Sequence, residues 1–397
     1  MAKRKKAVKS AGRKARELIE VFFATNRFVE GTDANPTFGP GFHSKGPHYL
    51  RFGRAEVMPP RKDGDDFEVS SIRLAPEQIG TMGVERQLGS EQIFETLRRI
   101  MAEGDGETLI YLHGYANTMQ SALERAAELK VRYQHDTKKP LTVFAFCWPT
   151  DGRMVPFLSY HSDRNDARMS GIAIARAMLR LRDWLAKLRE QAAEQGERER
   201  CTKRPHLVAH SMGNYALRHA VQAVRSEMTG NLQRLFDQVF LMASDEDDDT
   251  LEKDYKLGIL PDLCKAVHVY YATKDVPLDE LADITKMLPD RLGTEGPRSK
   301  DGLHRKINLV DCTDVAFTKL THGWHQYYRL RHEVYEDVRQ VLAGAAPREI
   351  IGREFLPEER SYRIIPLGER VAVSAARPAA RRGGGSLRHV PAGRAAS

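Results

Sequence analysis

Long hydrophobic runs are missing from this 397-residue sequence. No stretch approaches the roughly 18 uncharged apolar residues that a membrane-spanning helix requires. Residues 1–20 are basic but contain no apolar segment of the kind that a secretory signal needs. The sequence therefore predicts a cytoplasmic protein without a membrane span.

Cysteine is scarce, and the four cysteines form no C-x-x-C pair and no spacing typical of a metal site. Three of them lie in or beside apolar, strand-like runs, which predicts buried free thiols. The turns between strands and helices also lack a glycine-rich dinucleotide fingerprint and a phosphate-binding loop. We therefore expect no metal and no cofactor. The cysteines are Cys201 and the three in apolar runs, Cys147, Cys264 and Cys312.

The formal net charge of +8 is confined to the two ends of the chain. Residues 1–16 hold eight Lys and Arg and no acid, and residues 370–397 hold six Arg and no acid. Residues 17–369 keep 48 basic and 54 acidic side chains, a net of −6. Both ends lack periodic apolar residues, so we expect basic, disordered tails. We interpret them as solubilising segments that attract nucleic acid only weakly, and not as a specific nucleic-acid site.

Short apolar strands alternate with helical segments along the rest of the chain, after a looser hairpin at 48–57 and 67–74. This alternation predicts an α/β fold with a mostly parallel sheet of about eight strands and helices on both faces. We expect one domain over residues 17–345, followed by an extension at 346–369. The predicted strands are 20–25, 108–112, 141–147, 206–209, 239–242, 266–272 and 307–310, and the predicted helices are about 120–133, 166–194 and 324–342.

The segment P-H-L-V-A-H-S-M-G-N-Y, residues 205–215, is the most informative part of the sequence. An apolar strand runs directly into Ser211, and a helical pattern follows it. A serine at such a turn, between small residues two positions away on each side, is typical of the nucleophile elbow of serine hydrolases. Those small residues are Ala209 and Gly213. Glycine is usual at the first position, and alanine is the next smallest choice.

A nucleophilic serine needs a base, and the base needs an acid that holds its orientation. In hydrolases with this elbow, the three residues follow in the order Ser, acid, His. Asp275 comes after the strand at 266–272, and His325 comes after the last strand. We therefore predict Ser211, Asp275 and His325 as the catalytic residues. The alternatives are Asp245, Asp311 and Asp314 for the acid and His322 for the base.

Two backbone N–H groups are candidates to stabilise the oxyanion of the reaction. Met212 begins the helix after Ser211, where the helix dipole favours negative charge. Tyr115 follows the strand that ends in His113-Gly114, at the same edge of the sheet. We predict that the N–H groups of Met212 and Tyr115 form the oxyanion hole.

Taken in order, these segments resemble the alpha/beta-hydrolase superfamily, and within it a bacterial, largely uncharacterised branch usually called esterase/lipase-like. The resemblance covers about residues 18–342. It implies the hydrolase fold and a Ser211–Asp275–His325 triad, but no particular substrate. In the W-H-Q-Y-Y segment, Gln326 replaces a more usual small polar residue. The matching segments are F-F-A-T-N-R (22–27), L-H-G-Y-A-N (112–117), F-C-W-P-T-D-G (146–152), A-H-S-M-G (209–213), Y-Y-A-T-K-D (270–275) and W-H-Q-Y-Y (324–328).

The favoured hypothesis is a serine hydrolase that cleaves a small-molecule carboxylic ester or thioester through an acyl-enzyme. The alternative is a catalytically silent member of the fold that binds a ligand or a protein. The acidic run at 245–249, which we expect to be a solvated loop or a helix start, would disfavour anionic substrates if it overhung the pocket. The sequence does not specify the oligomeric state.

Overall fold

A computed structural model describes residues 16–62, 65–76, 88–103, 106–136, 138–153, 158–194, 205–227, 234–273, 290–316 and 324–370. Several positions singled out from the sequence lie outside these ranges. They are Asp275, His322, Cys201 and nearly all of the two basic tails.

Within the described residues, eleven strands form one sheet, and its central strands are parallel. The predicted α/β class is therefore confirmed. Antiparallel pairs stand only at the two edges, and a separate hairpin joins β2 (Arg27–Thr32) to β3 (Asn35–Phe42). Across the sheet the strands are β12 (Arg353–Leu356), β13 (Ser361–Ile364), β11 (Ile307–Asp311), β10 (Ala266–Tyr271), β9 (Gln238–Met242), β8 (His206–His210), β6 (Glu107–Leu112), β7 (Leu141–Cys147), β1 (Ile19–Thr25), β4 (Arg51–Met58) and β5 (Glu68–Leu74).

The predicted number of about eight strands is wrong, in part because the hairpin β12–β13 extends the sheet past β11. Its two strands have four residues each and carry charged side chains, so they show no apolar run. The side chain of Arg353 in β12 is nevertheless buried, and Asp337 accepts hydrogen bonds from its Nε at 2.5 Å and its Nη2 at 2.7 Å. This ion pair lets a charged strand lie against the core.

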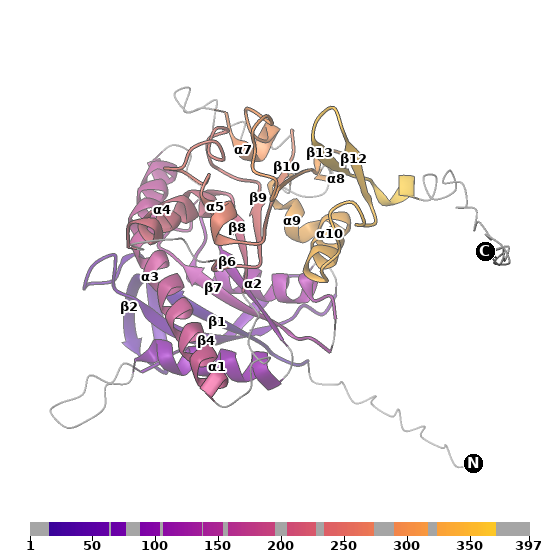
Figure 1. The fold of residues 1–397 in the computed structure, drawn as a ribbon. Coiled ribbons are helices and arrows are strands. Elements are labelled where there is room, and N and C mark those ends of the chain that lie inside the picture. The colour runs from indigo at the N-terminus through magenta and orange to yellow at the C-terminus, as the bar shows by residue number, and fades with distance from the viewer. Residues whose placement is uncertain are drawn as a thin grey trace, which may run out of the picture.

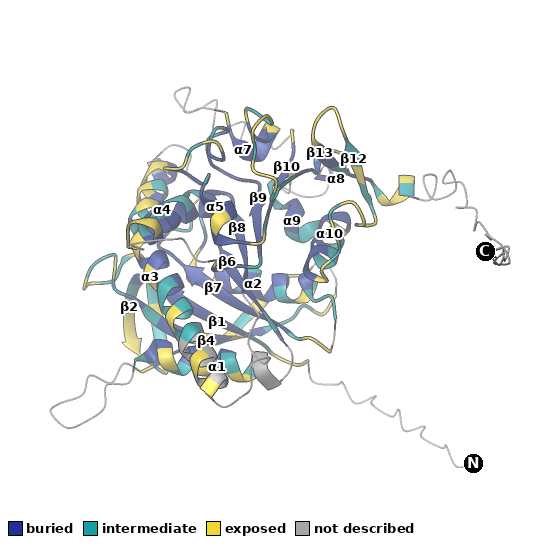
Figure 2. Cartoon of the chain, in the orientation of Figure 1, coloured by how far each residue is buried: buried dark blue, intermediate teal, exposed yellow. Residues whose placement is uncertain are grey.

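Helices cover both faces of the sheet, as Figure 1 shows. One face carries α1 (Gly89–Glu103), α3 (Leu158–Glu194) and α4 (Met212–Glu227). The other carries α2 (Met119–Tyr133), α9 (Tyr327–Leu330) and α10 (His332–Leu342). The strands between them are buried, whereas the outward sides of the helices are exposed (Figure 2). Shorter helices are α5 (Leu260–Leu263), α7 (Leu292–Glu295), α8 (Thr313–Ala316) and the 3-10 turn η1 (Trp324–Gln326).

The helix boundaries differ from the prediction at three places. The first is α1, which was not predicted and which packs on the sheet through Ile93, Phe94 and Leu97. The second is α3, which begins at Leu158 and not at the predicted residue 166. The segment 324–342 is broken into η1, α9 and α10, because Gln326 leaves the helical backbone angles between η1 and α9 and Arg331 is extended between α9 and α10.

The strands β6, β8, β9, β10 and β11 run parallel, so the loops after them meet at one edge of the sheet. This edge brings together Tyr115, Ser211 and the acidic segment 244–249. No helix among the described residues is long and apolar enough to span a membrane.

Candidate active site

Ser211 stands at the sharp turn between β8 and α4 and is buried. Its φ of 54° is in the left-handed region, which costs free energy for any residue other than glycine. The turn is held by its own backbone: the N–H of Ser211 donates to the carbonyl of Met242 at 3.0 Å. The carbonyl of Ser211 in turn accepts from the N–H of Asp245 at 3.2 Å. The neighbouring strand end thus stabilises a strained backbone at the serine.

Two glycines let the elbow lie against the loop that follows β6. A Cβ atom on Gly213 would lie 2.5 Å from the carbonyl oxygen of Leu112 and 2.6 Å from that of His113. A Cβ atom on Gly114 would lie 2.8 Å from the Cβ of Ser211. A Cβ atom does not approach other heavy atoms this closely in folded proteins, so both positions require glycine.

His325 lies in η1, and its ring is next to the elbow. The ring centroids of His325 and His210 are 4.7 Å apart, and the Nε2–H of His210 donates to the carbonyl of His325 at 3.0 Å. The following residues are anchored to the sheet, since the hydroxyl of Tyr327 donates to the carbonyl of Tyr270 at 2.9 Å. The structure therefore brings the predicted base into contact with His210, the residue before the predicted nucleophile, across 115 residues of sequence.

The rival acids each have other partners. The carboxylate of Asp245 accepts from the hydroxyl of Tyr160 at 2.8 Å and lies 3.3 Å from the guanidinium of Arg291. Asp311 accepts from both the N–H and the hydroxyl of Thr313, the first residue of α8, at 2.8 and 2.5 Å. The remaining rival, Asp314, pairs with Arg363 at 3.0 Å.

The acidic segment 245–249 is not the solvated loop that we expected. Asp245, Glu246 and Asp248 are buried, and burial raises the pKa of Glu246 to about 7 even though the nearby Arg218 lowers it. Because cations compensate the segment, it gives no reason to disfavour anionic substrates. The pairs are Asp245 with Arg164 and Arg291, Glu246 with Arg218, Asp247 with Arg291 and Lys256, Asp248 with Arg298, and Asp249 with Lys256.

The loop with the predicted oxyanion donor Tyr115 is held in place by a carboxylate. Asp163, near the start of α3, accepts from the N–H of Ala116 at 3.2 Å and from the N–H of Asp151 at 3.2 Å. Ala116 has a φ of 54°, so this loop also contains a strained residue. The second predicted donor, Met212, is the first residue of α4, where backbone N–H groups have no partner within the helix.

A buried arginine ties two of these loops together. Arg27 donates from Nη2 to the carbonyl of Asn117 at 2.6 Å and from Nη1 to the carbonyl of Thr150 at 3.1 Å. Burial lowers its pKa to about 10, so the guanidinium stays charged at neutral pH. Asn117 then donates from its side chain to the carbonyls of Gly114 and Tyr115, at 2.9 and 2.8 Å. The loop after β6 is thus fixed from both sides.

His113 is neutral and has a packing role at this edge. Its ring stacks on the ring of Trp148, with centroids 4.9 Å apart, and its Nδ1 pairs with the carbonyl of Gly114 at 2.9 Å. Burial lowers its pKa to about 3. His113 is therefore a packing residue of this loop and does not titrate near neutral pH.

Sequence reasoning missed Asp163 as a residue that holds the site. It precedes the predicted helix, and no motif marks it, since its partners are backbone N–H groups of two distant loops. Arg27 was noted only as part of a segment that resembles the superfamily.

The carboxyl of Asp163 makes the stability of the fold depend on pH. Burial raises its pKa from 3.8 to about 7, so the folded chain binds a proton at this site between about pH 4 and pH 7, where the unfolded chain does not. The contribution of Asp163 to stability therefore falls as the pH rises through this window. Urea unfolding measures the free energy of unfolding of the wild type and of Asp163→Asn. From about pH 4 to pH 7 the value for the wild type should fall relative to that for the variant.

The exposed Asp65 provides the matched control, because Asp65→Asn makes the same chemical change outside the core. A difference between wild type and Asp163→Asn that does not vary with pH would contradict this assignment.

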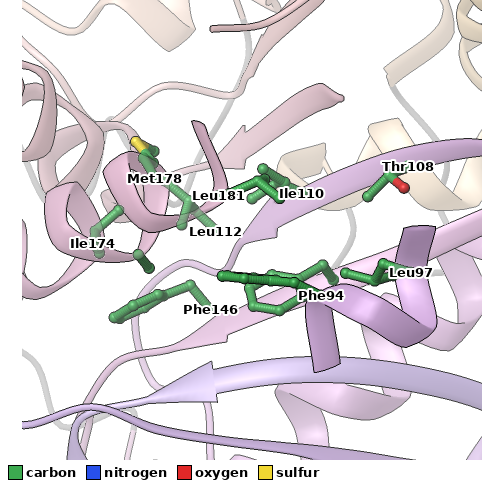
Figure 3. A pocket seen from close by; sticks show the side chains of 11 residues that line it. Phe94, Leu97, Thr108, Ile110, Leu112, Phe146, Ile174, Met178 and Leu181 are labelled. Atoms are coloured by element: carbon green, nitrogen blue, oxygen red, sulfur yellow. The ribbon is translucent and has the colours of Figure 1, made fainter. Parts of the chain in front are cut away.

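An apolar cavity lies between α1, α3 and the strands β6 and β7 (Figure 3). Its volume is about 20 Å³, which is close to the space of one water molecule. Phe94, Ile110, Phe146 and Met178 are among its lining residues, and neither Ser211 nor His325 is. We interpret it as a packing gap in the core and not as an acyl pocket.

Comparison with known proteins agrees with the fold. A family model described as "alpha/beta hydrolase of unknown function (DUF900)" matches residues 90–344. No curated protein and no solved structure matches the chain. Among the described residues, no group of three or more His, Cys, Asp or Glu side chains is arranged to hold a metal ion.

Proposed function

The chain belongs to the alpha/beta hydrolases of unknown function, and from this we propose that it is a serine hydrolase that cleaves a carboxylic ester or thioester. Ser211 is the nucleophile, His325 the general base and Asp275 the acid that orients it. The N–H groups of Tyr115 and Met212 form the oxyanion hole. The observation that carries this proposal is the left-handed backbone of Ser211 in an elbow whose preceding residue contacts the ring of His325.

The reaction has two stages. His325 takes the proton of the Ser211 hydroxyl, and the oxygen attacks the carbonyl carbon of the substrate to form a tetrahedral oxyanion. The intermediate collapses, the bond to the leaving group breaks, and His325 returns the proton to the departing alcohol or thiol. Water then attacks the acyl-enzyme with His325 as base again, which releases the acid and restores the Ser211 hydroxyl.

Two features of the site support this assignment over the rival residues. Asp245, Asp311 and Asp314 each have a cation, a hydroxyl or a backbone N–H as partner. Arg27 and Asp163 fix the loop that contains Tyr115. Gly114 of this loop lies so close to Ser211 that only glycine fits there. A rigid loop beside the nucleophile is what an oxyanion hole requires, because its donors must be in place before charge develops.

A fluorophosphonate probe tests the proposal directly. We expect the probe to label the full-length chain once, and peptide mass spectrometry should locate the adduct on Ser211. A series of p-nitrophenyl esters and acyl thioesters should then show turnover, with the preferred chain length defining the acyl group. A folded chain that resists the probe would instead favour a catalytically silent protein that binds its ligand without reaction.

A further inference from the structure

We propose that His210, the residue before the nucleophile, is a positioning residue that sets the place of His325 relative to Ser211. The inference rests on the proposed function, in which His325 is the general base. His210 ends β8 and is buried.

The hydrogen bond between the two histidines links the backbone of the nucleophile to that of the base. A carbonyl oxygen only accepts, so Nε2 of His210 carries the proton that it shares with the carbonyl of His325 at 3.0 Å. The two rings are also in contact, tilted by 52°. Because His210 precedes Ser211 directly, a shift of η1 away from the elbow would break this bond.

The ring of His210 has little freedom to move. It stacks on the ring of Tyr328 with centroids 4.4 Å apart, and Tyr328 is held by the hydroxyl groups of Tyr111 and Tyr133. On the side of the loop after β6, a Cβ atom on Gly114 would already lie 3.1 Å from Nδ1 of His210. The donor that points at His325 is therefore preorganised, as a positioning group must be.

The surroundings of His210 also keep it neutral. Burial lowers its pKa well below the usual value, and the neighbouring His325, Arg125 and Arg329 lower it further. The hydrogen bond to the carbonyl of His325 opposes this shift. A neutral ring retains one proton, on Nε2, and places no second positive charge beside His325 when that residue takes the proton of Ser211.

Substitution of His210 by glutamine or by asparagine distinguishes the hydrogen bond to His325 from the packing of the ring. The amide nitrogen of glutamine can occupy the place of Nε2, whereas that of asparagine reaches only as far as Nδ1. His210→Gln therefore keeps the donor to the carbonyl of His325, and His210→Asn removes it. Both replace the ring by a smaller polar side chain, so the loss of stacking on Tyr328 is common to the two variants.

The test compares both variants with the wild type in the full chain, using a p-nitrophenyl ester that the wild type hydrolyses. For His210→Asn we expect kcat to fall by about 10²-fold with KM changed less than about threefold, because a small misplacement of a catalytic group has this effect. The rate of fluorophosphonate labelling should fall by the same factor. For His210→Gln we expect kcat to recover to within about tenfold of the wild type.

Equal losses in the two variants, or full activity of His210→Asn, would overturn the positioning role while the wild type remained active. An inert wild type would count against the proposed function itself. Thermal melting tests whether both variants fold. If either does not, ¹⁵N-histidine NMR of the wild type is the deciding measurement. One histidine ring with Overhauser contacts to a tyrosine must be in the Nε2–H tautomer, and this tautomer must persist from about pH 5 to pH 9. A tautomer change in that range would contradict the proposal.

Discussion

Replacing Ser211 with alanine is expected to reduce ester hydrolysis by at least about 10⁴-fold, since removal of the nucleophile leaves only the oxyanion hole and substrate binding. Fluorophosphonate labelling should disappear as well, because residues 209–213 then contain no hydroxyl group. Steady-state kinetics with the preferred ester and gel detection of the probe measure the two effects. Activity that survives in Ser211→Ala would place the nucleophile elsewhere in the chain.

A glycine at the same position is the matched variant. Ser211 has a φ of 54°, and alanine keeps this strain whereas glycine relieves it. We expect Ser211→Gly to be as inactive as Ser211→Ala but more stable by about 1 kcal/mol. Urea unfolding of the two variants measures that difference. Their equal inactivity with unequal stability would separate the chemical role of the hydroxyl from the strain of the turn.

Replacing Gly213 with alanine is expected to destabilise the fold by about 3 kcal/mol or more, because the new methyl group meets rigid atoms. Its Cβ would lie 2.5 and 2.6 Å from the carbonyl oxygens of Leu112 and His113, both backbone atoms of the neighbouring strand end. Relief requires α4 to move away from β6, which would displace Ser211. Chemical denaturation should show the loss of stability, and the labelling rate should fall with it.

Gly41 of β3 provides the control, because a Cβ atom there has nothing within 4 Å. We expect Gly41→Ala to change the free energy of unfolding by less than about 1 kcal/mol. If Gly213→Ala proved as stable as Gly41→Ala, the close packing of the elbow against β6 would be wrong.

The fold class could be predicted because each central strand is a short apolar segment that can be recognised from its own residues. Strands such as β7 and β8 are buried along their whole length between two layers of helices, so they read as continuous apolar runs. The hairpin β12–β13 could not be predicted in this way. Its Arg353 is buried only because Asp337 of α10 lies beside it, and a pattern of single residues carries no record of such a partner.

In the candidate site, too, the local sequence pattern could be predicted, whereas contacts between distant residues could not. Ser211 between Ala209 and Gly213 is a local pattern, and its turn requires small residues whatever the rest of the chain does. The identity of the acid stays a prediction, since Asp275 lies outside the described residues. The partners of the acidic segment and the contact between His210 and His325 come from other elements of the fold.

By itself, the sequence determined an α/β sheet with helices on both faces and a serine at a strand-to-helix turn. Apolar periodicity and the residue preferences of turns involve residues that are close in sequence, so they can be recognised without the structure. Only the tertiary structure decided that the acidic residues 245–248 pair with arginines and a lysine, and that His210 donates to a carbonyl 115 residues away. The physical reason is that ion pairs and long-range hydrogen bonds depend on which strand ends meet at one edge of the sheet.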